Sequence, residues 1–554
     1  MTRVIIVGGV AGGMSVATRL RRLDERVEIV VLERSGHVSY ANCGLPYFVG
    51  GVIEEEADLL LQTPERLFDR FRLDVRVNAE VVGVDPSAHE VTICSTGDGT
   101  ATILTYDKLV LSPGAVPVRP PIPGFERVRT LRTVEDAERL LSDVTGKPEG
   151  AVVIGAGFVG LETAENLSRN GIAVTIVEAA DQVLTPLDPE MAVLVAAELV
   201  AQGVDVLTGA AVTSVTDSHV ILASGRKIPA ELVVASIGVR PDVRLAEMAS
   251  LAIGPSGGIA VDEVNRTSDP DIYAVGDAVE KPDAVGGDTS LIALANVANR
   301  QGRRVADHIA GLNPIAEPSL GTAIVKIFDL VAAMTGWNER RLRAAGRTYR
   351  VVHSHPFSHA TYYPGAEPMA LKLLFDPQDG TILGAQAVGA EGVDKRIDVI
   401  ATAMQGGIKA GGLADLELAY APPFSSAKDP VNMLGYMAEN IGSGECDVVE
   451  PDEIPRLVAD GWVLLDVRTE KEHLGAAIPG SINAPLDELR EQIDVLPRSP
   501  FLVYCAVGQR GHTATSLLHE LGYEARNLDG GYRTWAAAEA ARLGDPGRLI
   551  VQGS

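Results

Sequence analysis

Cysteine is scarce in this chain, which has only four among 554 residues: Cys43, Cys94, Cys446 and Cys505. They lie far apart and form no C-x-x-C pair, which excludes a disulfide framework and a cysteine-rich zinc site, so no metal centre is expected. Such usage is typical of a reducing compartment and predicts a cytoplasmic protein. Each cysteine is then either an inert core residue or a reactive thiol, and the neighbouring sequence has to decide between them.

Basic residues and long apolar runs are also in short supply. Lysine and arginine total 48 against 74 aspartate and glutamate, a net charge of -26, which opposes binding to a nucleic-acid backbone. No run of about 18 uncharged apolar residues occurs, so no membrane span is expected. The opening MTRVIIVGGVAGGMSVA has glycines that fit a strand and tight turn better than a signal peptide.

A strand, glycine turn, helix, strand pattern occurs twice, in residues 3–34 and 150–178. Each copy is predicted to be a βαβ unit of the kind that binds a dinucleotide. The second copy has an intact G-x-G-x-x-G motif, followed at the end of its second strand by Glu178, whose carboxylate could accept hydrogen bonds from a ribose diol. The motif glycines are Gly155, Gly157 and Gly160.

The first copy is imperfect, because Val10 stands where a glycine belongs between Gly8 and Gly13, although Glu33 still follows twenty residues later. A third element, TSDPDIYAVGDAVE, places Asp277 after an apolar strand, where it could hold a ribityl or phosphate hydroxyl. Two dinucleotide sites and this distant element predict one flavin nucleotide and one nicotinamide nucleotide.

The remaining sequence predicts two further domains. After about residue 321, strands joined by turns precede a helical stretch, which indicates an α+β domain. The segment IGSGECDVVE is small and polar, as in a linker, and short strands then alternate with helices. The predicted α/β architecture is an FAD-binding domain (1–115 and 250–320), an NAD(P)H-binding domain (116–249), an α+β domain (321–440), a linker (441–450) and a final α/β domain (451–550).

Cys43 lies in SYANCGLPYFVGG, directly after the first βαβ unit. Its neighbours Asn42, Gly44 and Pro46 are typical of a functional turn, although an inert apolar cysteine is the alternative. A thiolate here could be stabilised by a helix N-terminus and attack a disulfide, with reduced flavin supplying electrons. No second cysteine lies four or five residues away, so Cys43 has to act as a single thiol.

Residues 1 to about 440 resemble the coenzyme A disulfide reductase group of the flavin-dependent pyridine-nucleotide disulfide oxidoreductases. The resemblance rests on GGVAGGMSVATRLRRL, SYANCGLPY, LSPGA, GAGFVGLE, YAVGDA, ANRQGR, YYPGA and APPFSSAKDPVN. It implies two Rossmann-like domains for FAD and NAD, and it makes Val10 a feature of the family's flavin site. The implied flavin-binding residues are Gly8, Val10, Ala11, Gly12, Gly13, Glu33, Arg34, Asn42, Ser112, Pro113, Gly114, Gly276 and Asp277.

The resemblance also implies a coenzyme A site, for coenzyme A as substrate or as a tightly bound ligand. Arg19 and Arg22 are three residues apart on one helix and could clamp phosphates, although periodicity alone favours an ordinary solvated charge run. The matching positions are Ser15, Arg19, Arg22, Ser39, Asn42, Asn299 and Lys428.

In the resembled family the α+β domain mediates homodimerisation and sends two tyrosines into the partner's active site. The matching residues are Tyr362 and Tyr420, with Tyr363 as an adjacent alternative to the first. Their phenols could donate a proton to a departing thiolate or orient Cys43. Taken alone, a loop tyrosine is more often a packing residue.

Two further residues bear on cofactor and substrate. Glu178 is followed by Ala179 and Ala180 rather than an arginine for a 2′-phosphate, which favours NADH over NADPH. Relatives that reduce oxygen or peroxide carry a histidine in the first glycine turn, where this chain has Ala11. That difference disfavours an NADH oxidase or peroxidase.

Residues 450–550 resemble a rhodanese through LLDVR, EHLGAAIPGSINAPL, VYCAVGQRGHTA and LDGG. Cys505 ends a strand and opens a loop before a helix, so backbone N–H groups could hold an anionic persulfide, with Arg510 adding positive charge. The alternative is an inert domain that keeps only the fold. Cys94 and Cys446 have no such setting and are interpreted as incidental.

These features together predict an enzyme that uses FAD and NADH to reduce sulfur-sulfur bonds. The expected substrates are coenzyme A disulfide, coenzyme A persulfide or polysulfide, with Cys43 as the redox thiol and Cys505 handling sulfane sulfur. Two alternatives stay open: an NADH oxidase or peroxidase, and a sulfur carrier or redox sensor without turnover.

Overall fold

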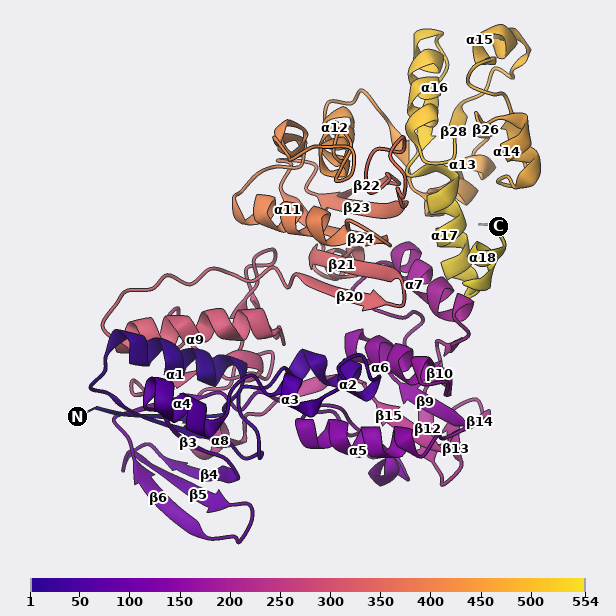
Figure 1. Cartoon of the computed structure of the whole chain (residues 1–554). Helices are drawn as coiled ribbons and strands as arrows, with labels where there is room; N and C mark the ends of the chain where they lie inside the picture. The colour runs from indigo at the N-terminus through magenta and orange to yellow at the C-terminus, as the bar shows by residue number, and fades with distance from the viewer. Residues whose placement is uncertain (1, 553–554) are drawn as a thin grey trace. The chain divides into compact units, whose positions relative to one another are not determined.

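The computed structural model describes residues 2–552 (Figure 1). The chain forms two compact units, the first from residues 2–177 and 211–321, the second from residues 178–210 and 322–552. No helix in residues 2–552 has the length and apolar character needed to cross a membrane.

The flavin domain of the first unit contains a five-stranded parallel sheet in the order β17-β7-β1-β2-β3. Its central strands are almost wholly apolar, as required when both faces of a parallel sheet are covered. The strands are β1 (Arg3–Val7), β2 (Glu28–Leu32), β3 (Asp74–Arg76), β7 (Lys108–Leu111) and β17 (Ile272–Ala274).

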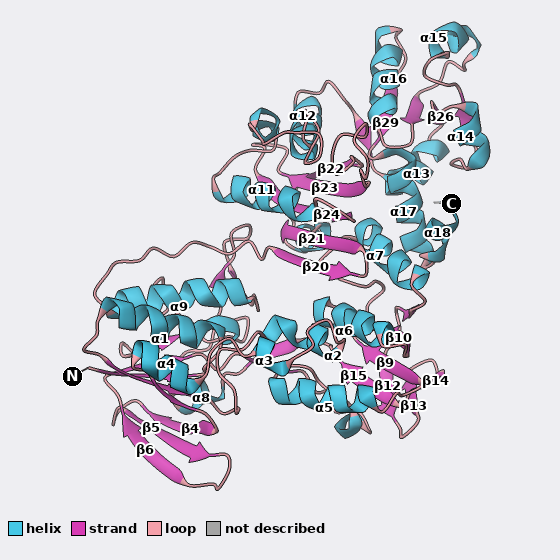
Figure 2. Cartoon of the chain, in the orientation of Figure 1, coloured by secondary structure: helices cyan, strands magenta, loops and turns pink. Residues whose placement is uncertain are grey.

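Side chains alternate along β1, so each face of this sheet has its own core. Val4 and Ile6 pack with residues of α1 (Ala11–Leu23) and α9 (Ala295–Ile309), which lie side by side in Figure 1. Ile5 and Val7 pack on the other face, with residues of a separate three-stranded antiparallel sheet, which is visible in Figure 2. Those strands are β4 (Ala79–Asp85), β5 (Glu90–Ser95) and β6 (Ala101–Thr105).

The chain returns to the flavin domain earlier than the boundary predicted at residue 250. Strand β16 (Val239–Pro241) pairs with β8 (Ala115–Pro117), and α8 (Arg244–Met248) follows at once. Leu245 and Ala246 of α8 are buried in the flavin-domain core. These buried residues help to cover the sheet. The boundary predicted from the sequence alone placed them in the neighbouring domain.

The second βαβ unit forms as predicted. β9 (Gly150–Ile154) lies between the parallel strands β10 (Ala173–Val177) and β15 (Leu232–Ala235), and α6 (Phe158–Arg169) connects β9 to β10. The other elements of the first unit are α2 (Leu45–Val49), α3 (Glu56–Leu59), α4 (Pro64–Phe71), α5 (Val134–Thr145), β12 (Val212–Val215), β13 (His219–Leu222), β14 (Lys227–Pro229), β18 (Lys281–Pro282) and β19 (Thr289–Ser290).

The second unit contains the predicted α+β domain, built on an antiparallel sheet in the order β20-β21-β24-β23-β22. Apolar residues of α11 and α12 pack against this sheet, and α7 also contacts it. The elements are α7 (Pro189–Ala201), β20 (Ala323–Ile327), β21 (Leu330–Gly336), α10 (Glu339–Ala344), β22 (Arg350–Ser354), β23 (Met369–Phe375), β24 (Ile382–Gly389), α11 (Val393–Gln405) and α12 (Pro430–Gly442). The second unit also contains β11 (Asp205–Leu207), which is not a strand of this sheet.

The final domain has a parallel sheet in the order β25-β29-β28-β26-β27 with helices around it. The linker predicted for 441–450 is shorter in the structure, because α12 extends to Gly442 and β25 already pairs with β29 at Val448–Val449. The elements are β25 (Val448–Val449), α13 (Ile454–Ala459), β26 (Val463–Asp466), α14 (Glu470–Gly475), β27 (Ile482–Asn483), α15 (Leu489–Gln492), β28 (Phe501–Tyr504), α16 (Gln509–Glu520), β29 (Ala525–Leu528), α17 (Gly531–Leu543) and α18 (Gly547–Gln552).

Candidate functional site

A cleft of about 1230 Å³, its open mouth included, lies in the first unit and is lined by both glycine-rich and cysteine-bearing segments. Every predicted flavin-binding residue except Gly13 lines it, together with Cys43 and Arg132. The lining residues from that prediction are Gly8, Val10, Ala11, Gly12, Glu33, Arg34, Asn42, Ser112, Pro113, Gly114, Gly276 and Asp277.

The backbone geometry of the first glycine turn explains why two of its positions require glycine and why a valine is tolerated at a third. Gly8 has a φ of +98°, and a Cβ on Gly13 would lie 1.9 Å from the Gly8 carbonyl oxygen, so neither position accepts a side chain. Val10 is the N-cap residue of α1 with a φ of -109°, an ordinary value for a residue with a Cβ. The turn therefore keeps the close approach of strand and helix despite the missing glycine.

Glu33 is positioned by two backbone donors at this turn. Its Oε2 accepts from Gly9 N at 2.7 Å, and its Oε1 accepts from Ser35 N at 3.0 Å. Burial raises the pKa of the carboxyl group, whereas the two backbone donors oppose that rise. A fixed acidic group after β2 and a helix N-terminus at the turn fit the ribose and pyrophosphate of a dinucleotide such as FAD.

Cys43 lies in a short 3-10 turn, Asn42–Gly44, immediately before α2, and its side chain is exposed. The expectation of a stabilised thiolate is not met by the surrounding side chains. Desolvation by neighbouring groups raises the pKa of the Cys43 thiol, the carboxylate of Glu162 raises it further, and Arg132 opposes both. The protein groups around this sulfur thus favour its protonated form.

Glu162 is a residue that the sequence argument missed, although it lies in the quoted motif GAGFVGLE. It belongs to α6, and its Oε1 accepts a hydrogen bond from Tyr47 Oη at 3.2 Å. Burial raises the pKa of this carboxyl group to about 7, so it changes charge near neutral pH. Glu162 therefore acts electrostatically on Cys43, while Tyr47 holds its carboxyl group by a hydrogen bond.

Arg132 was also missed, and it connects two of the predicted residues. Its guanidinium pairs with the Asp277 carboxylate at 2.7 Å, and its backbone oxygen accepts from Asn42 Nδ2 at 2.7 Å. Both Asn42 and Asp277 line the cleft, as does Arg132 itself. No motif marked this arginine, because its partners are distant in the sequence.

The predicted coenzyme A residues are only partly brought together. Ser15 Oγ donates to Asn299 Oδ1 at 2.9 Å, joining α1 to α9. Arg19, however, pairs with Asp307 at 2.6 Å, while Arg22 lies over the Phe71 ring at 5.4 Å. The two arginines thus have separate partners rather than a shared one, and their phosphate clamp stays a prediction.

Two other coenzyme A positions have distinct settings. Ser39 adopts a φ of +50°, and its backbone N–H donates to the Gly9 carbonyl at the flavin turn. Lys428 belongs to the second unit, where its ammonium lies 5.9 Å from the centre of the Tyr436 ring.

The structure distinguishes Tyr362 from its neighbour Tyr363. The hydroxyls of Tyr362 and Tyr420 lie 2.9 Å apart, and both side chains are exposed. This hydrogen bond raises the pKa of Tyr362. Tyr363 instead packs edge-on against His359, with ring centres 5.6 Å apart. The hydrogen bond between Tyr362 and Tyr420 groups the two tyrosines named from the resemblance, and their role in a partner's active site stays a prediction.

The second glycine turn is built like the first. Gly155 has a φ of +100°, and a Cβ on Gly160 would lie 2.1 Å from the Gly155 carbonyl oxygen. Gly157 is the N-cap residue of α6 and has open space at the position of a Cβ. Glu178 directly follows β10, and its Oε1 accepts from Ala180 N at 2.8 Å. The residue types and local turns fit a nicotinamide dinucleotide.

In the final domain, Cys505 directly follows β28 and is fully buried at the start of the loop that leads to α16. Arg510, near the start of α16, lies beside it and is held by Glu472 through two contacts of 2.6 and 2.9 Å. This pairing lowers the pKa of Glu472 to about 2, so the carboxylate stays charged. The predicted positive charge at the cysteine is therefore largely neutralised.

Replacing Glu162 by glutamine should lower the pKa of the Cys43 thiol, because a nearby negative charge is removed. Alkylation of Cys43 should be faster by about threefold at pH 8, where Glu162 is mostly ionised. The measurement is the pH dependence of Cys43 alkylation in a Cys505→Ser background. Glu149→Gln, which removes an exposed carboxylate, is the control, and an unchanged Cys43 profile in E162Q would contradict the assignment.

Replacing Glu472 by glutamine should raise the use of anionic sulfur donors at Cys505, because the positive charge of Arg510 is then no longer balanced by a neighbouring carboxylate. Glutamine can keep the capping box that Glu472 forms with Thr469 at the start of α14. We expect kcat/KM for thiosulfate to rise by roughly three- to tenfold, with little change for a neutral organic trisulfide. Glu470→Gln serves as control; equal changes for both donors would rule out the electrostatic explanation.

Three segments of the chain match known protein families. Residues 2–302 match the pyridine nucleotide-disulphide oxidoreductase family, residues 322–430 its dimerisation domain and residues 450–538 the rhodanese-like domain. The chain is 33% identical over 443 residues to a coenzyme A disulfide reductase of Staphylococcus aureus, covering 79% of this chain and all of the relative. The coenzyme A disulfide reductase of Staphylococcus haemolyticus is 34% identical over 445 residues, and the alignment covers 80% of this chain and all of the relative.

Solved structures extend the similarity through the final domain. Reduced Bacillus anthracis CoADR-RHD is 46% identical with a TM-score of 0.96, and the alignment covers 98% of each chain. An NAD-dependent persulfide reductase from A. fulgidus is 38% identical with a TM-score of 0.91, covering 96% of this chain and all of the other. A water-forming NADH oxidase from Lactobacillus brevis is 25% identical with a TM-score of 0.77, covering 80% of this chain and all of its own. The chain belongs to the pyridine nucleotide-disulphide oxidoreductase family and carries a C-terminal rhodanese-like domain.

Proposed function

We propose that this chain is a homodimeric, cytoplasmic reductase that uses NADH to reduce the sulfur-sulfur bonds of coenzyme A disulfide, coenzyme A persulfide or polysulfide. The observation that carries the proposal is Cys43, an exposed lone cysteine that lines the cleft of the flavin turn. Relatives named for coenzyme A disulfide and persulfide reduction support this substrate class. The matched dimerisation domain supports the homodimer.

Bound FAD would accept a hydride from NADH and pass an electron pair to sulfur, as is usual for this cofactor pair. The residues that would hold FAD are the glycine turn, Glu33 and Asp277, while Gly155–Gly160 and Glu178 would hold NADH. The family and the fit of both glycine turns support these two cofactors.

Cys43 supplies the covalent step. Its thiolate attacks a disulfide R–S–S–R, so a Cys43–S–S–R bond forms and one thiolate RS⁻ leaves. Two electrons from NADH then break that mixed disulfide, which returns the Cys43 thiolate and releases the second thiol. With a persulfide R–S–SH, the same attack on the R-bearing sulfur releases hydrogen sulfide.

Charge around Cys43 helps to place the protons. The surrounding side chains raise the pKa of its thiol, so a base has to take the proton before attack. Glu162 has a pKa of about 7 and acts on Cys43 electrostatically, and Tyr47 holds its Oε1 by a hydrogen bond. We assign to Glu162 the exchange of the Cys43 proton near neutral pH, with Tyr47 as the residue that positions its carboxyl group.

Replacing each cysteine in turn should separate the two activities. Cys43→Ser should lower NADH oxidation with coenzyme A disulfide by at least about a thousandfold, because the attacking sulfur is lost. Cys505→Ser should leave that reaction within about twofold and slow turnover only when sulfur is supplied through a rhodanese donor. Steady-state kinetics with coenzyme A disulfide, coenzyme A persulfide, polysulfide and oxygen provide the test. Oxygen as the best substrate would instead support an NADH oxidase, and NADH oxidation that survives loss of Cys43 would contradict the reductase.

Replacing Glu178 by alanine should weaken the preference for NADH. The carboxylate would repel the 2′-phosphate of NADPH, so its removal should raise kcat/KM for NADPH by roughly tenfold, and the loss of its ribose hydrogen bonds should reduce kcat/KM for NADH. The measurement is kcat/KM with both nucleotides, with Asp181→Asn as a nearby control. No change in the NADPH to NADH ratio would exclude Glu178 from nucleotide recognition.

A further inference from the structure

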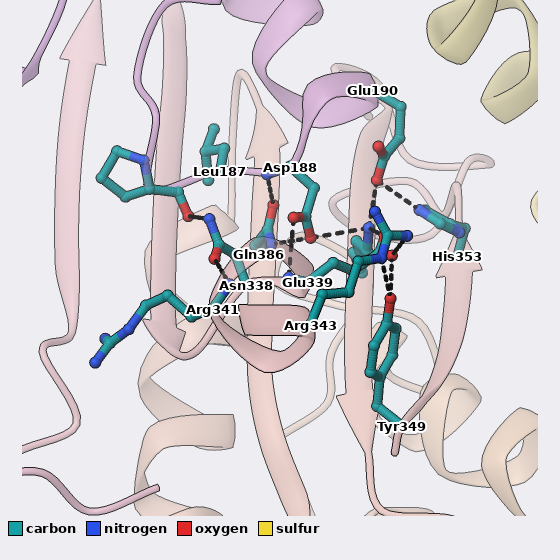
Figure 3. Close-up of polar contacts among 12 residues, drawn as sticks. Leu187, Asp188, Glu190, Asn338, Glu339, Arg341, Arg343, Tyr349, His353 and Gln386 are labelled. Carbon is teal, nitrogen blue, oxygen red and sulfur yellow. Dashed lines mark hydrogen bonds and ion pairs between the residues drawn. The ribbon is translucent and has the colours of Figure 1, made fainter. Parts of the chain in front are cut away.

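A cluster of buried charges in the second unit joins three parts of the chain that are far apart in sequence (Figure 3). At its centre, fully buried Lys372 of β23 contacts the carboxylates of Asp188, Glu190 and Glu339 at 2.9, 2.5 and 2.5 Å. Removing one partner from such a hub leaves a buried charge without its counterpart, which is costly. We call these residues, with His353 and Asp529, the buried charge cluster.

His353 of β22 connects the buried charge cluster to the rhodanese-like domain. Its ring Nδ1 lies 2.6 Å from Asp529 Oδ2, and its Nε2 lies 3.1 Å from Glu190 Oε1. A neutral imidazole has one N–H and could donate to only one of these carboxylates, so the geometry requires the imidazolium. Burial opposes that charge, but Asp529 and Glu190 outweigh it and raise the pKa of His353 to about 9.

The backbone of His353 holds Asp529 in addition to the contact made by its ring. The backbone N–H of His353 donates to both of its oxygens, at 3.1 and 3.0 Å. The Asp529 side chain is 1% exposed, and a Cβ on the next residue, Gly530, would lie 2.8 Å from the Cβ of His353. The turn that follows β29 therefore packs directly against His353.

The same turn supports the loop that begins at Cys505. Tyr532 N donates to the Cys505 carbonyl at 2.7 Å, and Arg533 N donates to the Ala506 carbonyl at 3.0 Å. A Cβ on Gly531 would lie 2.5 Å from the Cys505 carbonyl oxygen, so the two segments are in close backbone contact. Only Asp529 to Gly531 separate the His353 contact from the Cys505 loop.

Apolar packing extends this contact beyond the charges. Val193 of α7 clusters with Ala537 and Ala540 of α17, the helix that begins at Gly531. His355, two residues after His353, contacts Thr534 of α17 at 2.7 Å through Nε2. His355 thus joins the same two domains without touching Asp529, which makes it a matched control.

We propose that His353, a residue of the dimerisation domain, is a positioning residue for the sulfur-transfer site at Cys505. Its ring and backbone fix Asp529, Asp529 to Gly531 fix the Cys505 loop, and the reductase part of the chain thereby sets the geometry in which Cys505 accepts sulfur. The inference rests on the contacts of the rhodanese-like domain and does not require the proposed reduction at Cys43.

The test uses the full-length holoenzyme with thiosulfate and cyanide as probes. The Cys505 thiolate attacks the outer sulfur of thiosulfate, the sulfur-sulfur bond breaks and sulfite leaves, and the resulting persulfide gives its sulfur to cyanide as thiocyanate. His353→Gln should reduce kcat of this reaction by about tenfold or more, because small displacements of a reacting group are costly. KM for thiosulfate should stay within about twofold of wild type, because the change displaces the reacting loop and leaves the charges around the donor in place. NADH oxidation with coenzyme A disulfide in the same preparation should stay within about twofold of wild type.

Asp529→Asn tests the same link from the rhodanese side and serves if His353→Gln does not fold. The double variant should be no slower than the more affected single variant, because both changes break one contact. His355→Gln should leave kcat within about twofold. The proposal is overturned if folded His353→Gln or Asp529→Asn enzyme transfers sulfur at the wild-type rate, if the effects of the two variants add, or if His355→Gln has an equal effect. Loss of coenzyme A disulfide reduction in wild type, with the His353 effects intact, would instead refute only the proposed reductase.

Discussion

The function proposed for this chain depends on one sulfur atom, Cys43, being exposed in the cleft of the first glycine turn. The close contact of Gly13 with Gly8 fixes that turn, and the 3-10 segment before α2 brings Cys43 to the same cleft. Because no other cysteine lines the cleft in the described residues, this sulfur has to form its covalent intermediate with the substrate. The electrostatic surroundings, with Glu162 opposing Arg132, then decide how readily the thiol loses its proton.

The second sulfur site follows a different physical design. Cys505 is fully buried, the charge of the adjacent Arg510 is matched by Glu472, and the loop is supported from behind by the turn that carries Asp529. Cys43 is instead exposed and lies among groups that titrate near neutrality. One site is thus suited to electron transfer to sulfur in an open cleft, and the other to holding a sulfur atom in a fixed loop.

Much of the flavin site could be predicted from the sequence, because its glycines and acidic residues act through local turns. The predicted flavin residues other than Gly13 line one cleft, and Gly13 makes the close helix contact that its place in the motif requires. The return of the chain to the flavin domain at α8 was placed too late, because it depends on which apolar residues the sheet has to cover.

Residues whose roles depend on distant partners could not be predicted. Arg132 is 145 positions from Asp277, and His353 is 176 positions from Asp529, so no sequence spacing reports either contact. The separate partners of Arg19 and Arg22 likewise come from α9 and α4 and not from their own helix. The charge partners of a side chain depend on which residues the fold brings together. The glycine motifs depend only on residues that are close in the sequence.

An anaerobic titration of the enzyme with NADH, after incubation with coenzyme A disulfide and removal of excess, tests the central claim most directly. If Cys43 forms the mixed disulfide, wild type consumes one more equivalent of NADH per flavin than Cys43→Ala and releases one additional thiol. Equal consumption by the two proteins, with no bound thiol released, would contradict the account.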